Sequence, residues 1–197
     1  MASTNEERFW NWFQSSEDRL YHIERDLGPL MAELFKELGK VNEFISFEFG
    51  PIGSDGRRDF VLSSDGASEY FSAVEALHAA APELPRWTIV RFRQRKELGS
   101  GSMTTIANGL VETGTVRYIL ATEGLEASIA LFVPGADRTP DMANGETARL
   151  ILQEAVGEKD YGRYVVHVSV SDVTHDHYGV AKPITDLPAE FDTALKN

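Results

Sequence analysis

The sequence predicts an α+β fold in which a largely antiparallel sheet carries helices on one face. Two observations support this prediction. Apolar residues recur at helical spacing through an N-terminal helical region, about 6–42. The order strand, strand, helix, strand follows at about 44–96 and returns at about 104–172. We therefore expect a single domain over residues 1–197, with two degenerate ββαβ units and a C-terminal tail, 173–197.

The N-terminal region contains a dense aromatic cluster, Phe9-Trp-Asn-Trp-Phe13. Large aromatic side chains are mostly buried, so we predict that this cluster packs into the core. The alternative is a contact surface for a partner or for a second copy of the chain. From Leu20 to Val41 the apolar residues form one helical stripe. Gly28-Pro29 interrupts it, because proline lacks an amide donor and clashes with the preceding turn.

The first ββαβ unit begins with Phe44-Ile-Ser-Phe-Glu-Phe49, a strand-forming run that Gly50-Pro51 closes. Turn residues at 53–56 and a second apolar run, Asp59–Ser63, complete a predicted hairpin. Apolar residues at helical spacing then predict a helix over 71–81, after which the third strand is expected.

Three arginines occupy alternate positions of this third strand, Trp87–Arg95, at Arg91, Arg93 and Arg95. Alternation puts their side chains on one face, and it puts Phe92 on the other, beneath the helix. A row of guanidinium groups can bind a phosphate or a carboxylate through forked hydrogen bonds. We therefore identify the three arginines as a candidate anion-binding or partner-binding site.

The alternative for these arginines is ionic pairing within the sheet. Glu48 and Asp59 lie on the neighbouring predicted strands. Opposite charges on adjacent strands stabilise a solvent-facing sheet surface, so the pattern favours pairing over anion binding.

The second unit repeats the order with little residue identity, after a glycine-rich loop at Glu97–Ser102. Its elements are predicted from apolar runs and turn signals: strand candidates at Thr104–Glu112, Thr115–Thr122 and Leu125–Val133, a helix from about Asn144 to the cap residue Gly157, and a strand at Tyr164–Ser171. Alternation in the last strand puts Val166 on one face and His167 with Ser169 on a wet face. A short helix is expected at Pro188–Leu195.

Composition places the chain among ordinary globular proteins. Hydrophobic residues make up 42% of the 197 residues and charged residues 25%, and no run is long enough for a membrane span. The acidic net charge of −12 disfavours nucleic acid and anionic lipid as partners. Because the chain has no cysteine and its N-terminus lacks a signal-peptide pattern, we expect a soluble cytoplasmic protein.

Residues suited to catalysis or metal binding form no motif with a specific spacing. His175-Asp-His177 offers too few ligands to define a metal site, so we expect no metal. Ser100 and Ser102 lie in the glycine-rich loop, without a nucleophile elbow or a histidine nearby in sequence. We therefore expect no cofactor, and the sequence does not decide whether the protein is an enzyme.

Several stretches together resemble an uncharacterised family of bacterial cytoplasmic proteins. They are Phe9–Phe13, Phe47–Pro51, Trp87–Arg95 and Val156–Val170. The resemblance spans most of the chain, and its motifs look structural. It implies a single bacterial domain, and it carries no activity over to any residue of this chain.

Three functions are compatible with the sequence. Our prediction is a non-catalytic module that binds a protein or peptide, over the face bearing Arg91 and Arg93 or along an exposed strand edge. The alternative is a hydrolase or small-ligand enzyme, with a site assembled from distant residues such as His167 and Ser169. A third possibility is a structural protein that self-associates through the Phe9–Phe13 cluster. The oligomeric state is not predicted.

Overall fold

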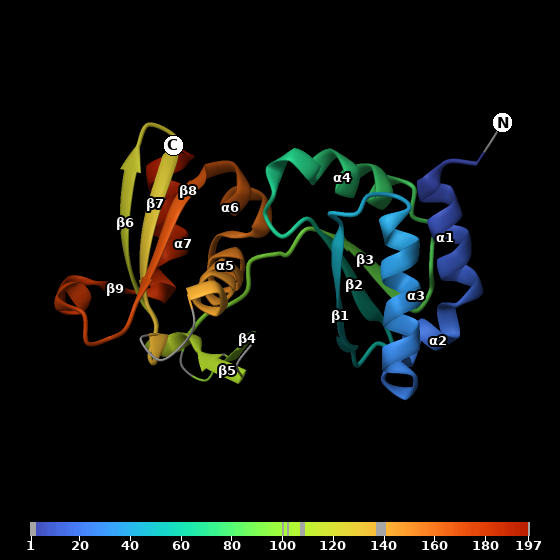
Figure 1. Ribbon diagram of the computed structural model, residues 1–197, viewed down its shortest axis with the longest axis horizontal. Helices are drawn as coiled ribbons and strands as arrows, with labels where there is room; N and C mark the ends of the chain where they lie inside the picture. The colour runs from blue at the N-terminus through green and yellow to red at the C-terminus, as the bar shows by residue number, and fades with distance from the viewer. Residues whose placement is uncertain (1–2, 100, 102, 107–108, 137–140, 197) are drawn as a thin grey trace. The chain divides into compact units, whose positions relative to one another are not determined.

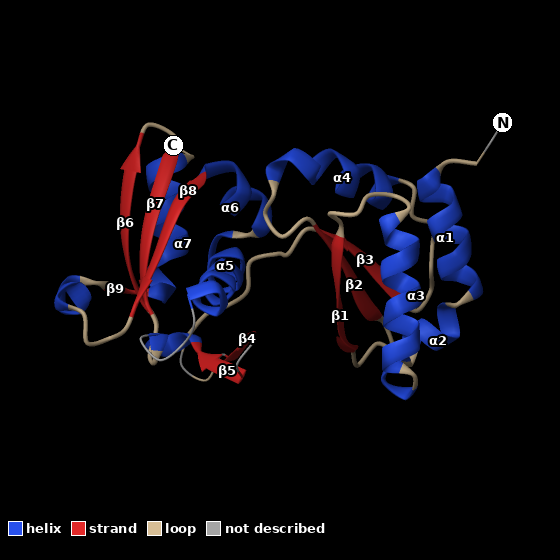
Figure 2. Ribbon diagram, in the orientation of Figure 1, coloured by secondary structure: helices blue, strands red, loops and turns tan. Residues whose placement is uncertain are grey.

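The computed structural model (Figure 1) describes residues 3–99, 101, 103–106, 109–136 and 141–196. These residues form seven α-helices, short 3-10 helices and three sheets, two of which are mixed (Figure 2), so the predicted α+β class is confirmed. None of the helices in the described ranges is long and apolar enough to cross a membrane.

The chain divides into two compact units, Met1–Arg93 and Gln94–Asn197, and each has its own hydrophobic core. Each unit contains one of the two predicted ββαβ repeats. The prediction of a single domain over residues 1–197 stays a prediction.

The first unit begins with three helices, α1 (Asn5–Ser15), α2 (Glu17–Tyr21) and α3 (Leu27–Gly39). Thr4 starts α1 through a capping box, in which its hydroxyl accepts from the amide of Glu7 at 3.2 Å. The interruption expected at Gly28-Pro29 lies earlier, at the 3-10 turn Ile23–Arg25. Pro29 instead occupies the first turn of α3, where a missing amide breaks no helical hydrogen bond.

A three-stranded sheet of order β1-β2-β3 completes the first unit. Its elements are β1 (Ser46–Ile52), β2 (Arg58–Ser63), α4 (Phe71–Ala79) and β3 (Trp87–Arg91). β1 and β2 are antiparallel, whereas β2 and β3 are parallel, as a helical crossover between them allows. Phe60 and Leu62 point into the core that α1, α3 and α4 also line, while Asp59 on the opposite face is exposed.

The aromatic cluster of α1 is part of this core. Three of its four aromatic side chains are buried. The ring centroid of Phe13 lies 5.0 Å from those of both Phe60 and Trp87. The indole of Trp10 donates a hydrogen bond to the carbonyl of Leu77 at 2.8 Å, which joins α1 to α4. The core interpretation is therefore confirmed, and self-association through the cluster stays a prediction.

The second unit repeats the pairing of the first. Its elements are β4 (Met103–Ile106), β5 (Gly109–Glu112), β6 (Arg117–Glu123), β7 (Glu126–Phe132), α5 (Asp141–Val156), α6 (Glu158–Tyr164), β8 (Val165–Ser171), β9 (Lys182–Pro183) and α7 (Leu187–Leu195). In the sheet of order β8-β7-β6-β9, β6 and β7 are antiparallel and β7 and β8 are parallel. Helices α5 and α7 pack together and share the core with Ile129 and Leu131 of β7.

Two expectations for this unit need correction. The single strand expected at Thr104–Glu112 is a separate hairpin, β4 with β5. The clean alternation expected along β8 is broken at Val166. Val165 pairs with Ala127 and His167 pairs with Ser128, so Val166 is an extra residue without a pairing partner, and its side chain is 60% exposed. Ser100 and Ser102 of the predicted glycine-rich loop lie outside the described residues.

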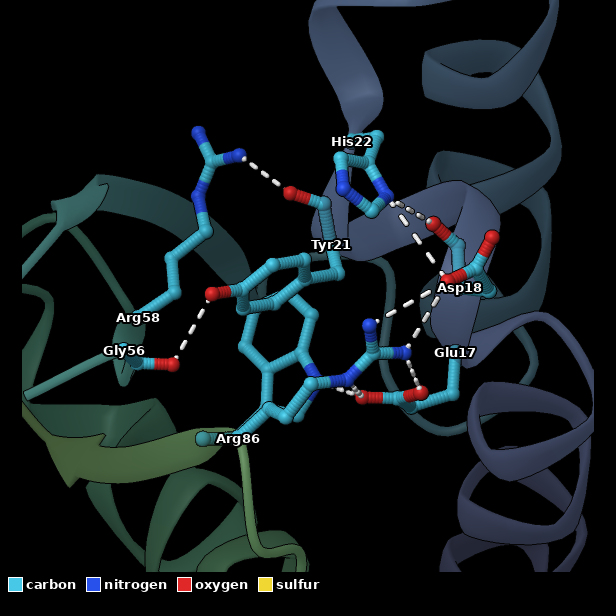
Figure 3. A network of polar contacts seen from close by, with 8 residues as sticks. Glu17, Asp18, Tyr21, His22, Gly56, Arg58 and Arg86 are labelled. Carbon is cyan, nitrogen blue, oxygen red and sulfur yellow. Dashed lines mark hydrogen bonds and ion pairs between the residues drawn. The ribbon is translucent and has the colours of Figure 1, made fainter.

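A polar network fastens α2 to the sheet of the first unit (Figure 3). The guanidinium of Arg86 donates to the carboxylates of Glu17 at 3.0 Å and Asp18 at 3.1 Å. It also lies over the ring of Tyr21, 4.4 Å from the centroid, and the hydroxyl of Tyr21 donates to the carbonyl of Gly56 at 2.8 Å. The hydrogen bond from Arg86 holds the pKa of Glu17 below its ordinary value of 4.5.

We expect acid to weaken the first unit through Glu17. Its pKa is lower in the folded than in the unfolded chain, so its pairing stabilises the fold above pH 4.5 and is lost as the pH falls through the folded pKa. The Trp87 indole also donates to the Glu17 carboxylate, at 2.7 Å; Glu17→Gln keeps an acceptor for it but removes the charge. Between about pH 5 and pH 3, the variant should therefore lose roughly 1 kcal/mol less unfolding free energy than the natural chain.

Urea unfolding followed by tryptophan fluorescence measures this difference, because all three tryptophans lie in the first unit, at positions 10, 12 and 87. Asp18→Asn, which removes a mainly exposed carboxylate from the same guanidinium, is the matched control. Identical pH dependence in Glu17→Gln and the natural chain would contradict the prediction.

Candidate functional site

The structure separates the three arginines that the sequence placed on one strand face. β3 ends at Arg91, and Phe92 has a left-handed backbone with φ of 63°, which residues other than glycine rarely adopt. Its ring turns into the core, 4.8 Å from the ring of Phe71. The chain direction changes there, so Arg93 is buried in the first unit and Arg95 belongs to the second. The predicted row of guanidinium groups is therefore wrong.

Arg93 is enclosed by acceptors from three segments. Its guanidinium donates to the carboxylate of Glu48, to the hydroxyl of Ser63 at 2.6 Å and to the carboxylate of Asp65 at 2.7 Å. Burial opposes the charged form, but the two carboxylates outweigh it and raise the pKa of Arg93. The pairing predicted with Glu48 is present, and Asp65 is a further partner.

The other two arginines also have carboxylate partners. Arg95 makes two hydrogen bonds of 2.7 Å to Asp192, which hold the pKa of that carboxyl well below its ordinary value. Arg91 is more exposed and approaches Glu75 at 3.9 Å. These contacts support the pairing alternative. Anion or partner binding by the three arginines stays a prediction.

Replacing each arginine by alanine should distinguish the structural Arg93 from the surface Arg91 by the unfolding free energy that is lost. Arg93→Ala should lower the unfolding free energy of the first unit by about 2–3 kcal/mol, because buried charge-assisted hydrogen bonds are lost. Arg91→Ala, the matched control, should cost less than about 1 kcal/mol, because its pair is long and exposed. Urea unfolding followed by tryptophan fluorescence measures both, and equal costs would contradict this assignment.

If phosphate raised the melting temperature of the natural chain but not of Arg91→Ala, the anion-binding prediction would hold instead.

Arg93 also holds the turn that follows β2. The hydroxyl of Ser63, which accepts from Arg93, also accepts from the amide of Asp65 at 2.9 Å. Asp65 has a left-handed backbone, φ 56°, and the ion pair with Arg93 holds it there. The turn continues to Ala67, whose carbonyl accepts from the amide of Tyr70 at 3.1 Å. Hydrogen bonds in this turn thus connect the position of Tyr70 to the buried Arg93.

A second turn presents Phe44 to solvent. The side-chain oxygen of Asn42 accepts from the amide of Phe44 at 2.9 Å, and its carbonyl accepts from the amide of Ile45 at 3.2 Å. Ile45 is buried by this turn, and Phe44 is left 51% exposed. The Phe44 ring stacks on that of Tyr70, with centroids 4.2 Å apart and planes inclined by 11°.

Two hollows flank this stacked pair. One, of about 320 Å³, is lined by Phe35, Phe44, Ile45, Tyr70 and the carboxylates of Glu43 and Asp65, among others. The other, of about 480 Å³, shares Glu43, Phe44 and Tyr70. We call this surface the aromatic groove. Sequence reasoning missed it by assigning Phe44 to a strand, although Asn42 two residues earlier is a turn signal.

A third cleft, of about 470 Å³, lies elsewhere in the first unit and includes Arg57, His78, Glu83 and Trp87 in its lining. The guanidinium of Arg57 donates to the hydroxyl of Thr88 at 3.2 Å and to the carbonyl of Trp87. Both acceptors are neutral, and among the described residues Arg57 has no carboxylate partner. The cleft therefore contains an arginine without an ion-pair partner in the described part of the chain, together with the acidic side chain of Glu83.

The histidines singled out in the sequence lie apart from these hollows. His167 and Ser169, proposed for an enzyme site, line none of the three. His175 accepts from the amide of His177 at 3.2 Å. Within the described ranges, no group of three or more histidine, aspartate or glutamate side chains is arranged to hold a metal ion.

Comparison with known proteins does not extend this description. No family model, no curated protein and no solved structure matches the chain. The likeness to an uncharacterised bacterial family stays a resemblance. The fold and the site define an α+β protein with an exposed aromatic groove.

Proposed function

We propose that the protein is a non-catalytic module that binds a protein or peptide in the aromatic groove of its first unit. The observation that carries the proposal is the exposure of Phe35 and Phe44, 55% and 51%, beside hollows large enough for side chains. Aromatic side chains clustered on a concave surface are typical anchors of protein interfaces.

The groove has two properties that favour peptide binding. Its aromatic pair is held by backbone turns and by Arg93, so little conformational entropy is lost when a ligand binds. It also includes Ser46, the first residue of β1, an edge strand of its sheet. An extended peptide seated on Phe44 can continue along that edge by main-chain hydrogen bonds. A cytoplasmic location accords with the absence of cysteine.

Selection from a random peptide library tests this function. We expect the immobilised full chain to retain peptides, and Phe44→Ala/Tyr70→Ala to weaken their binding by about tenfold or more. Leu125→Ala removes a comparably exposed apolar side chain from the second unit and should change nothing. Peptides that bind the natural chain and the groove variant equally would contradict the proposal. An unchanged unfolding midpoint, from tryptophan fluorescence, shows that the variant is folded.

The cleft at Arg57 supports a second candidate function, a hydrolase or small-ligand enzyme. It brings a histidine, a carboxylate and an arginine without an ion-pair partner to one hollow, where the arginine could bind a small anionic ligand. Phosphate or succinate should then raise the melting temperature by a few degrees, roughly 2–5 °C at saturating concentration. Arg57→Ala should abolish the shift, while Arg25→Ala, an exposed arginine outside this cleft, should keep it. No shift with either anion would count against this candidate.

A further inference from the structure

The charge of the aromatic groove is of one sign. Among the described residues that line its two hollows, the only charged side chains are Glu43 and Asp65. Asp65 is neutralised by Arg93 at 2.7 Å. Glu43 is exposed, lines both hollows and has no ion-pair partner in the described part of the chain. The groove therefore carries an uncompensated negative charge beside its aromatic rings.

Aromatic faces and a carboxylate attract the same kind of ligand. The face of a phenyl or phenol ring is electron-rich and attracts ammonium and guanidinium groups. Half of Phe44 is exposed, so one face of the stacked pair is open to a ligand. A cation on the stacked pair thus lies in the hollows that Glu43 also lines. An uncharged apolar side chain would use the rings but leave the carboxylate of Glu43 without a partner.

We infer that the occupant of the aromatic groove is a basic peptide segment of a partner protein. Its arginine or lysine side chain binds on the Phe44–Tyr70 pair beside Glu43, and a neighbouring apolar side chain contacts Phe35. This inference rests on the proposed function. A second copy of the chain, with its net charge of −12, would bring mainly like charge to the groove, and nucleic acid or anionic lipid would bring phosphates.

The test uses the full chain and the peptides it retains from the random library. Those whose retention depends on Phe44 and Tyr70 are sequenced, and we expect arginine and lysine to be enriched at least about twofold over the starting library. In the tightest peptide, arginine is then replaced by citrulline, which keeps the shape and removes the charge. Affinity should fall by roughly two- to tenfold.

Substitution of Glu43, tested with both the arginine and the citrulline peptide, shows whether the peptide's charge binds at that carboxylate. Glu43→Gln should weaken the arginine peptide by a similar factor, roughly two- to tenfold, and leave the citrulline peptide unchanged. Glu126→Gln, at an exposed glutamate of β7, is the matched control and should bind both peptides as the natural chain does.

The outcomes distinguish this inference from the function on which it rests. Groove-dependent peptides without basic enrichment, or equal binding of the arginine and citrulline forms, would overturn the basic partner and leave peptide binding intact. If no retained peptide depends on Phe44 and Tyr70, peptide binding at the groove is overturned, and the inference with it.

Discussion

The buried guanidinium of Arg93 makes the contacts on which the aromatic groove of the first unit depends. A charge removed from water must be matched by acceptors, and here they come from β1, from the end of β2 and from the turn beyond it. One side chain therefore determines how three segments meet. Because the aromatic groove begins at that turn, the requirement to neutralise Arg93 also shapes the surface that holds Tyr70.

The two units share the same order and pairing of strands around their crossover helices. An antiparallel hairpin is followed by a helical connection and by a strand parallel to the hairpin's second strand. The helical crossover covers one sheet face, and further helices complete the core: α1 and α3 in the first unit, α7 in the second. The shared element order was visible in the sequence because the hydrophobic period changes at each element. The strand pairing was not, because it depends on contacts between distant segments.

Sequence reasoning failed where one residue departs from a regular repeat. The strand pattern through Arg91 was extended to Arg95. Phe92 is buried as predicted, but its left-handed backbone ends the alternation, so the next residue, Arg93, is buried as well. In the same way, a bulge at Val166 interrupts an alternation that looks continuous. Neither residue is a glycine or proline that would mark the change. The tertiary contact of Phe92 with Phe71 selects its conformation, and no local signal carries that information.

The aromatic groove was not predicted from the sequence for a related reason. Aromatic residues are usually buried, so Phe44 was assigned with its neighbours to a strand. Which of Phe44 and Ile45 enters the core is decided by the Asn42 turn, and the exposed ring acquires its partner, Tyr70, from another segment. The arginines were the most conspicuous charge pattern in an acidic chain, yet Arg93 stabilises the surface from within. The groove's own charge comes from Glu43, one acidic residue among many in the sequence, and only its place beside the stacked rings distinguishes it.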